Sequence, residues 1–122
     1  MTKKTGKGAA ALALLLACLC LAACGKKPVT DEQALSAVKS WCCARNPELE
    51  AMAETGEYPV WWEVESSGER EVTVLFRSYT GALLRYYVDR DTGETYVTEF
   101  VPGITPEEQR TEETLNVRDW LD

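Results

Sequence analysis

The sequence predicts an α+β domain: an N-terminal amphipathic helix packed on a four-stranded antiparallel β-meander, followed by short C-terminal helical turns. Two observations support this class. Apolar residues recur at helical spacing between Thr30 and Asn46, and four segments between residues 60 and 101 have the composition and alternation of strands. The connections between these segments are short, which favours antiparallel neighbours. One helix on one face of such a sheet buries both apolar surfaces.

The helix is expected to begin at Thr30, because Thr30 and Gln33 have the spacing of a capping box. It is expected to stop at Asn46, since the residue before a proline is disfavoured in helical conformation. Its apolar stripe comprises Ala34, Leu35, Val38, Trp41 and Cys42. A second short helical segment is expected over residues 47–55, closed by Gly56.

The four expected strands cover residues 60–65, 71–79, 83–88 and 95–101. Turn-forming residues, glycine among them, separate these segments. The side chains expected to face the helix are Trp62, Val74, Phe76, Tyr86 and Val88. After the strands, residues 105–108 are expected to open one helical turn. Asn116 is expected to cap a last turn that docks Val117, Trp120 and Leu121.

Residues 1–23 are interpreted as a cleaved signal peptide. Three lysines open the chain, no charged residue lies between Gly8 and Gly25, and Leu12–Leu21 is strongly apolar. This apolar segment is shorter than the roughly 20 residues that a membrane-spanning helix needs. An uncleaved membrane anchor is the alternative interpretation.

The segment Leu21-Ala22-Ala23-Cys24 resembles the lipobox of bacterial lipoproteins. The resemblance implies that a diacylglycerol-type lipid is attached to the Cys24 sulfur and that the chain is cleaved before this residue. Residues 24–29 would then be a lipidated tether and residues 30–122 a single α+β domain. The expected location is the extracytoplasmic face of a bacterial cell membrane, or the outer membrane if the cell is Gram-negative.

Cleavage increases the acidity of the protein. The leader removes three lysines and no acidic residue, so 99 residues remain with 10 basic and 20 acidic side chains. This charge argues against a nucleic-acid partner. It also predicts that the domain stands off from anionic lipid, while Lys26 and Lys27 are favourable beside the head groups.

Cys42 and Cys43 are the thiols that remain once Cys24 carries lipid. Helical spacing places Cys42 on the apolar stripe and Cys43 near Lys39, on the polar face. One interpretation is a small buried hydrophobe beside an incidental thiol. The alternatives are a Cys43 thiol with a lowered pKa that forms a disulfide-linked dimer, and a strained redox pair between the two cysteines.

Four side chains fall on the strand faces opposite the expected core: Trp61, Tyr79, Arg85 and Tyr87. Aromatic and arginine side chains are enriched in the energetic centres of protein interfaces. We therefore expect a partner surface there, unless the C-terminal segment covers it. Glu63 and Glu65 share this face, but nothing in the sequence gives them the separation or the raised pKa of a glycosidase acid pair.

The chain contains no histidine, which excludes His-dependent nucleophiles, general bases and zinc ligands within this chain. We expect no catalytic residue, no cofactor and no metal. The spacing Asp89-x-Asp91-x-Gly93 is attributed to turn chemistry, because an EF-hand-type loop would need a bidentate Glu where Phe100 stands.

The segment Tyr87-Val88-Asp89…Thr92-Gly93-Glu94 is similar to the hairpin of PepSY-type domains. Those domains are small extracytoplasmic α+β modules, sometimes linked to protease inhibition. The Trp61-Trp62 strand departs from their pattern, and no functional residue is carried over.

The sequence therefore predicts a lipid-anchored extracytoplasmic lipoprotein that is a non-enzymatic interaction module. Its partners are expected to be the membrane, through Cys24, and an envelope protein, peptide or polymer. The alternative is a small-ligand-binding or enzymatic domain with a cleft between helix and sheet.

Overall fold

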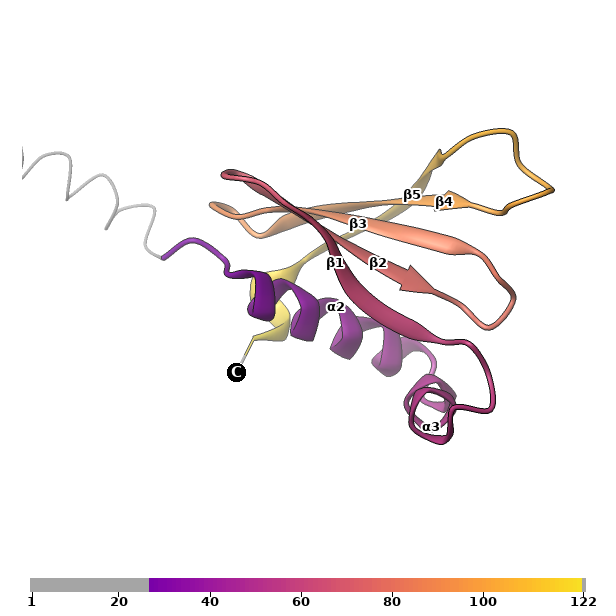
Figure 1. Ribbon diagram of the computed structural model, residues 1–122. Helices are drawn as coiled ribbons and strands as arrows, with labels where there is room; N and C mark the ends of the chain where they lie inside the picture. The colour runs from indigo at the N-terminus through magenta and orange to yellow at the C-terminus, as the bar shows by residue number, and fades with distance from the viewer. Residues whose placement is uncertain (1–26, 122) are drawn as a thin grey trace, which may run out of the picture.

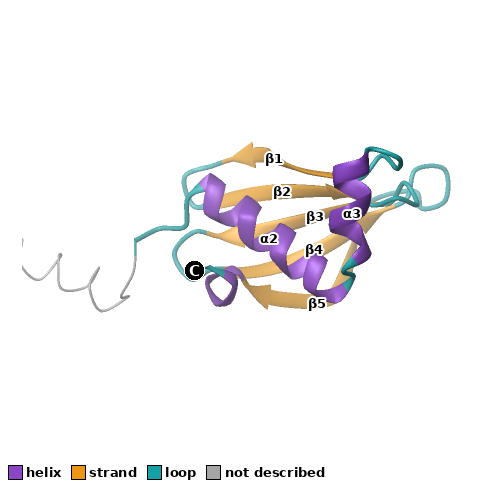
Figure 2. Cartoon of the chain, turned by 90° about the horizontal axis from the view of Figure 1, so that it is seen from below, coloured by secondary structure: helices purple, strands orange, loops and turns teal. Residues whose placement is uncertain are grey.

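The computed structural model describes residues 27–121, which form two α-helices, five strands and a short 3-10 helix. The helices are α2 (Asp31–Arg45) and α3 (Glu48–Thr55), and the 3-10 helix is η1 (Val117–Trp120). The strands are β1 (Trp61–Ser67), β2 (Glu71–Arg77), β3 (Leu83–Asp89), β4 (Glu94–Phe100) and β5 (Gln109–Asn116). They form one antiparallel sheet in chain order, and α2 crosses one face of it (Figures 1 and 2).

The prediction of a four-stranded meander under one helix is wrong, although the α+β class is right. The structure has two helices and a fifth strand: the second helix, α3, confirms the short helical segment expected over residues 47–55 and closed by Gly56, whereas the fifth strand was not predicted. Residues 105–108 form no helix, and β5 follows them directly. β5 escaped prediction because its sequence is polar on both faces and carries no apolar alternation. It is a strand because its backbone pairs with β4, a contact that a local pattern does not reveal.

Helix α2 begins as its sequence predicts. The Thr30 hydroxyl accepts a hydrogen bond from the Gln33 backbone N–H at 3.1 Å, and the Gln33 side chain accepts one from the Thr30 N–H at 3.0 Å. Its buried side chains are Ala34, Ala37, Val38, Trp41 and Cys42. The Trp41 ring meets Tyr86 of β3 edge to face, with 5.7 Å between centroids. The stripe read from the sequence is thus the surface that docks on the sheet.

The inner face of the sheet, defined as the face that α2 covers, supplies the rest of the core. Val74, Phe76, Tyr86 and Val88 lie in this core, as predicted, and Trp62 packs partly buried against it. Val97 of β4 and Val117 of η1 complete it, both with no exposed surface. Asn116 caps η1 by accepting a hydrogen bond from the Arg118 backbone N–H. Neither described helix is long and apolar enough to cross a membrane.

Two arginines, named here the arginine clamp, bind the start of the described chain to one end of the sheet. Arg90 donates to the carbonyl of Val29 at 2.9 Å and to the Asp31 carboxylate at 2.7 Å. Arg118 donates to the Lys27 carbonyl at 2.9 Å. Val29, which the sequence analysis assigned to the tether, is buried and donates its N–H to the Arg90 carbonyl. Residues 27–29 are therefore held by the domain.

Candidate functional site

The face of the sheet opposite α2, named here the open face, has no helix of the described chain over it (Figure 1). Strand register decides which side chains meet there. Arg85 of β3 lies between Leu75 of β2 and Thr98 of β4. Tyr87, two residues further along β3, lies opposite Tyr96 of β4. Arg85 and Tyr87 are thus neighbours on one surface, as the sequence predicted.

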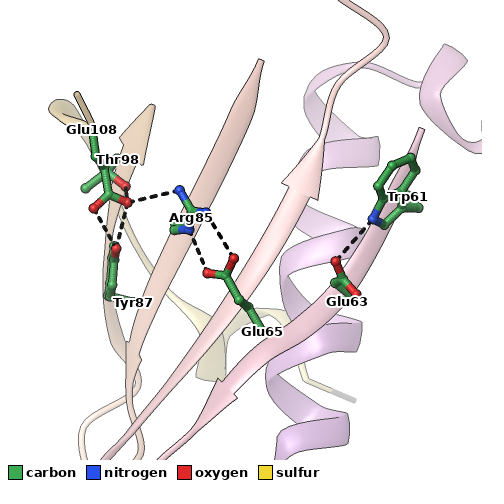
Figure 3. A network of polar contacts seen from close by, with 7 residues as sticks. All are labelled: Trp61, Glu63, Glu65, Arg85, Tyr87, Thr98 and Glu108. Carbon is green, nitrogen blue, oxygen red and sulfur yellow. Dashed lines mark hydrogen bonds and ion pairs between the residues drawn. The ribbon is translucent and has the colours of Figure 1, made fainter. Parts of the chain in front are cut away.

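Arg85 lies at the centre of a polar network on this face (Figure 3). Its Nε and Nη2 atoms donate to the two carboxylate oxygens of Glu65 at 2.6 and 3.0 Å, which is a bidentate ion pair. Its Nη1 atom lies 3.5 Å from Oε1 of Glu108. The β1–β2 register shifts between Val64 and Ser66, so Glu65 lies in a β-bulge. Bulges commonly redirect a side chain in this way.

Glu108 receives two further donors. The Tyr87 hydroxyl lies 2.7 and 2.9 Å from its carboxylate oxygens, and the Thr98 hydroxyl donates to Oε1 at 2.7 Å. Glu108 belongs to the connection between β4 and β5, so these bonds hold that connection over the sheet. The network lies over the middle of the open face: Thr73 and Leu75, the β2 partners of Tyr87 and Arg85, and Thr98 within the network are each only 7% exposed.

The network also sets the protonation of its members. Partial burial raises the pKa of Glu108, but hydrogen bonds from Thr98 and Tyr87 and the charge of Arg85 outweigh it, so the pKa is lowered. Burial, reinforced by the bond to Glu108, raises the pKa of Tyr87 to about 12. Glu108 is thus a carboxylate and Tyr87 a neutral donor at neutral pH. That assignment suits positioning better than proton transfer, because neither group titrates near neutrality.

A groove of about 540 Å³ lies beside this network, towards β5. Its wall includes a stack of three groups. The rings of Tyr87 and Tyr96 are nearly parallel, with 4.7 Å between centroids, and the Arg110 guanidinium lies 3.9 Å from the Tyr96 centroid. Glu71 and Glu94 contribute carboxylates to the lining, and among the described residues neither forms an ion pair. The groove therefore combines aromatic surface with an excess of negative charge.

A third carboxylate of the groove, Asp89, is occupied by the turn that follows β3. Its Oδ1 accepts hydrogen bonds from the backbone N–H groups of Asp91 and Thr92 at 2.8 and 3.0 Å. These bonds, that of Thr92 foremost, lower the pKa of Asp89. Gly93 completes the turn at φ +82°, where a side chain would collide with Asn116 and Arg118. The calcium-like spacing in the sequence is thus used by a turn.

The other two predicted surface residues lie apart from the network. Trp61 lies on the open face at the start of β1, where its Nε1 donates to Glu63 and the Arg77 guanidinium lies over its ring. Tyr79 lies beyond the end of β2, in the turn to β3, and meets Tyr58 edge to face. Trp61 is 42% and Tyr79 49% exposed. The structure therefore joins only Arg85 and Tyr87 into one site.

Both described cysteines are free thiols. The Cys42 sulfur is buried in the core, 3.3 Å from the Tyr86 hydroxyl, and burial raises its pKa. Cys43 is partly buried. Burial raises its pKa too, and the charge of Glu50 adds to this effect against that of Lys39. The lowered pKa that one alternative assigned to Cys43 is therefore not found, because Lys39 is the weakest of the three influences. Cys24 lies outside the described residues.

Four residues of the site are not predicted from the sequence: Tyr96, Thr98, Glu108 and Arg110. The first two carried a usable signal, because Val97 faces the core and its neighbours on β4 must face the other way. Glu108 carried no such signal in the sequence, because its position over the sheet depends on the path of the connection between β4 and β5. Arg110 was assigned to no strand.

No protein-family model, no curated protein and no solved structure matches the chain. The site must therefore be interpreted from its own geometry. The groove lies on the open face, whereas the side chains between α2 and the sheet form a contiguous buried cluster.

Proposed function

We propose that the protein is a lipid-anchored extracytoplasmic lipoprotein whose open face binds a cationic peptide or protein segment. The leader and the Cys24 motif support the anchor. The proposal of a binding surface rests on the groove beside Tyr87 and Tyr96. This groove lies on the face of the sheet that no described helix covers. Aromatic walls with a few polar groups are the usual composition of such sites.

The charge of the groove supports a cationic partner. Glu71 and Glu94 offer carboxylates, whereas Arg110 is the single basic residue in the lining. Like charges placed together are costly, so a neutral or acidic segment would leave these carboxylates uncompensated. Glu108, the most strongly hydrogen-bonded carboxylate beside the groove, has its oxygens occupied by Arg85, Tyr87 and Thr98, which suits a supporting role for a binding surface.

Peptide titration followed by NMR tests the binding surface, using the chain without its leader and with Cys24→Ala. The probes are a lysine-containing Gly-Ser peptide and its glutamate-containing counterpart. We expect saturable shifts at Tyr87 and Tyr96 with the lysine peptide alone, and an affinity at least about tenfold weaker in Tyr96→Ala, since a well-packed aromatic anchor is worth 1.4 kcal/mol or more. Tyr79→Ala is the matched control, because Tyr79 is an exposed tyrosine outside the groove. Equal binding of both peptides would contradict the proposal.

Membrane fractionation of the full-length chain tests the anchor. Wild type is expected in the membrane fraction and Cys24→Ala in the soluble fraction, because two acyl chains are needed for stable attachment and this variant loses the lipid-bearing sulfur. Retention of Cys24→Ala in membranes would show that the leader remains as an uncleaved anchor.

A further inference from the structure

The arginine clamp fixes how far the domain can lie from its lipid. Arg118 Nη2 donates to the Lys27 carbonyl at 2.9 Å, and the Val29 N–H donates to the Arg90 carbonyl at 2.9 Å. Two residues, Gly25 and Lys26, lie between Cys24 and Lys27 in the sequence. An extended chain covers at most 3.3–3.6 Å per residue, so the Cα atom of Cys24 lies within about 11 Å of the Cα atom of Lys27, which the clamp holds.

The end of the sheet that carries the clamp, named here the clamp end, also carries η1 and the β3–β4 turn. The C-terminal segment lies beside the point where the described chain begins in both views (Figures 1 and 2), and Arg118 of η1 binds the Lys27 carbonyl there. Trp120 of η1 is 36% exposed there, whereas Val117 and Leu121 pack on the core. An exposed tryptophan next to a lipid attachment is placed where such rings are favoured, at the boundary between acyl chains and water.

We propose that the clamp end faces the bilayer and that Trp120 lies in its interfacial layer, an orientation that rests on the lipid anchor proposed for Cys24. The contact is assigned to the tryptophan ring. Charge attraction is not its source, because the clamp end holds both signs of charge: Asp91 and Asp119 stand with Lys27, Arg90 and Arg118. The partner is thus a lipid surface of zwitterionic head groups.

The orientation places the groove near the membrane. Asp89, Thr92 and Asn116 line the groove and also belong to the clamp end or border it. Trp61 starts β1 at the opposite end of the sheet, while Ser67, the last residue of β1, contacts Arg90 of the clamp. Seven residues of strand separate these ends by roughly 20 Å, at about 3.3 Å per residue. The two exposed tryptophans therefore report opposite ends of the domain.

Fluorescence quenching by brominated lipid tests the orientation. The lipidated protein, cleaved before Cys24, is reconstituted into phosphatidylcholine vesicles that contain brominated phosphatidylcholine, as wild type, Trp120→Phe and Trp61→Phe. We expect Trp120→Phe to lose most of the lipid-dependent quenching and Trp61→Phe to retain it. Iodide added to the water phase is expected to give the reverse pattern, with Trp61 accessible and Trp120 protected.

The outcomes separate the two proposals. A chain that carries no lipid on Cys24 overturns the anchor and, with it, the orientation. A lipidated, vesicle-bound chain whose quenching is lost in Trp61→Phe, or in neither variant, overturns the orientation alone. Arg118→Ala provides a second test, because it releases Lys27 without removing the lipid. We expect it to stay vesicle-bound and to lose at least half of the Trp120 quenching, whereas unchanged quenching would contradict the role of the clamp.

Discussion

The two faces of the sheet exclude water by different means. On the inner face, valines and aromatic rings from β2, β3 and β4 pack against α2, and their burial depends on volume and shape. On the open face, Thr73, Leu75 and Thr98 are nearly as buried, but their neighbours are the ionic and polar side chains of the Arg85 network. The inner face is therefore sensitive to cavities, and the open face to the charge and protonation of a few groups.

Trp41→Ala should produce the largest effect, because it removes the biggest side chain that α2 places on the sheet. We expect a loss of about 3–5 kcal/mol in the free energy of unfolding, from the transfer term and the cavity together. Urea unfolding measures it. Trp61→Ala, on the open face and 42% exposed, is the matched control, with an expected loss of about 1 kcal/mol. Similar losses of unfolding free energy in both variants would contradict the proposed difference between the inner face and the open face.

Glu108→Gln should weaken the open face by a smaller amount. The amide keeps the size of Glu108 but loses the charge that Arg85 and Tyr87 bind, so we expect about 1 kcal/mol, discounted for partial exposure. The pKa of Tyr87 should fall part of the way from about 12, since burial still raises it. Urea unfolding and an ultraviolet titration measure the two effects. Glu107→Gln, next to it and exposed, should change neither quantity.

The smallest expected effect concerns the pH dependence of stability at acid pH, that is, how steeply the free energy of unfolding falls as the pH is lowered. Asp31, Asp89 and Glu108 have pKa values lowered by folding. Their stabilising contribution is therefore present above the ordinary carboxyl pKa of about 4 and is lost as pH falls through the lowered values. Unfolding followed from pH 6 to 2 should give a shallower limb for Asp89→Asn than for wild type.

The control for this pH dependence is a core substitution. Val74→Ala should lower stability by a similar amount at every pH, because the substitution removes apolar volume from the fully buried core and changes no titratable group. An acid limb that flattens in Val74→Ala as much as in Asp89→Asn would contradict the assignment of pH sensitivity to the polar groups.

The same difference between the faces explains what could be predicted from the sequence. Apolar alternation identifies Val74, Tyr86 and Val88 as core, because burial on a strand repeats every second residue. Arg85 and Tyr87 were placed together by the same alternation. Glu65, Glu108 and β5 depend on a bulge, a connection and a backbone pairing. None of these leaves a local hydrophobic pattern, so the polar half of the site could only be seen in three dimensions.

The arginine clamp has a consequence for the order in which the protein is completed. The guanidinium of Arg118 that binds Lys27 lies 91 residues later in the chain. Because a protein is synthesised from its N-terminus, the residues of α2 and of the first strands are made before this contact can form. Arg90 can hold Val29 once the β3–β4 turn is present, whereas the bond to the Lys27 carbonyl waits until η1 has been made. In the folded protein, a residue near the C-terminus therefore helps to fix the point at which the N-terminal segment leaves the domain.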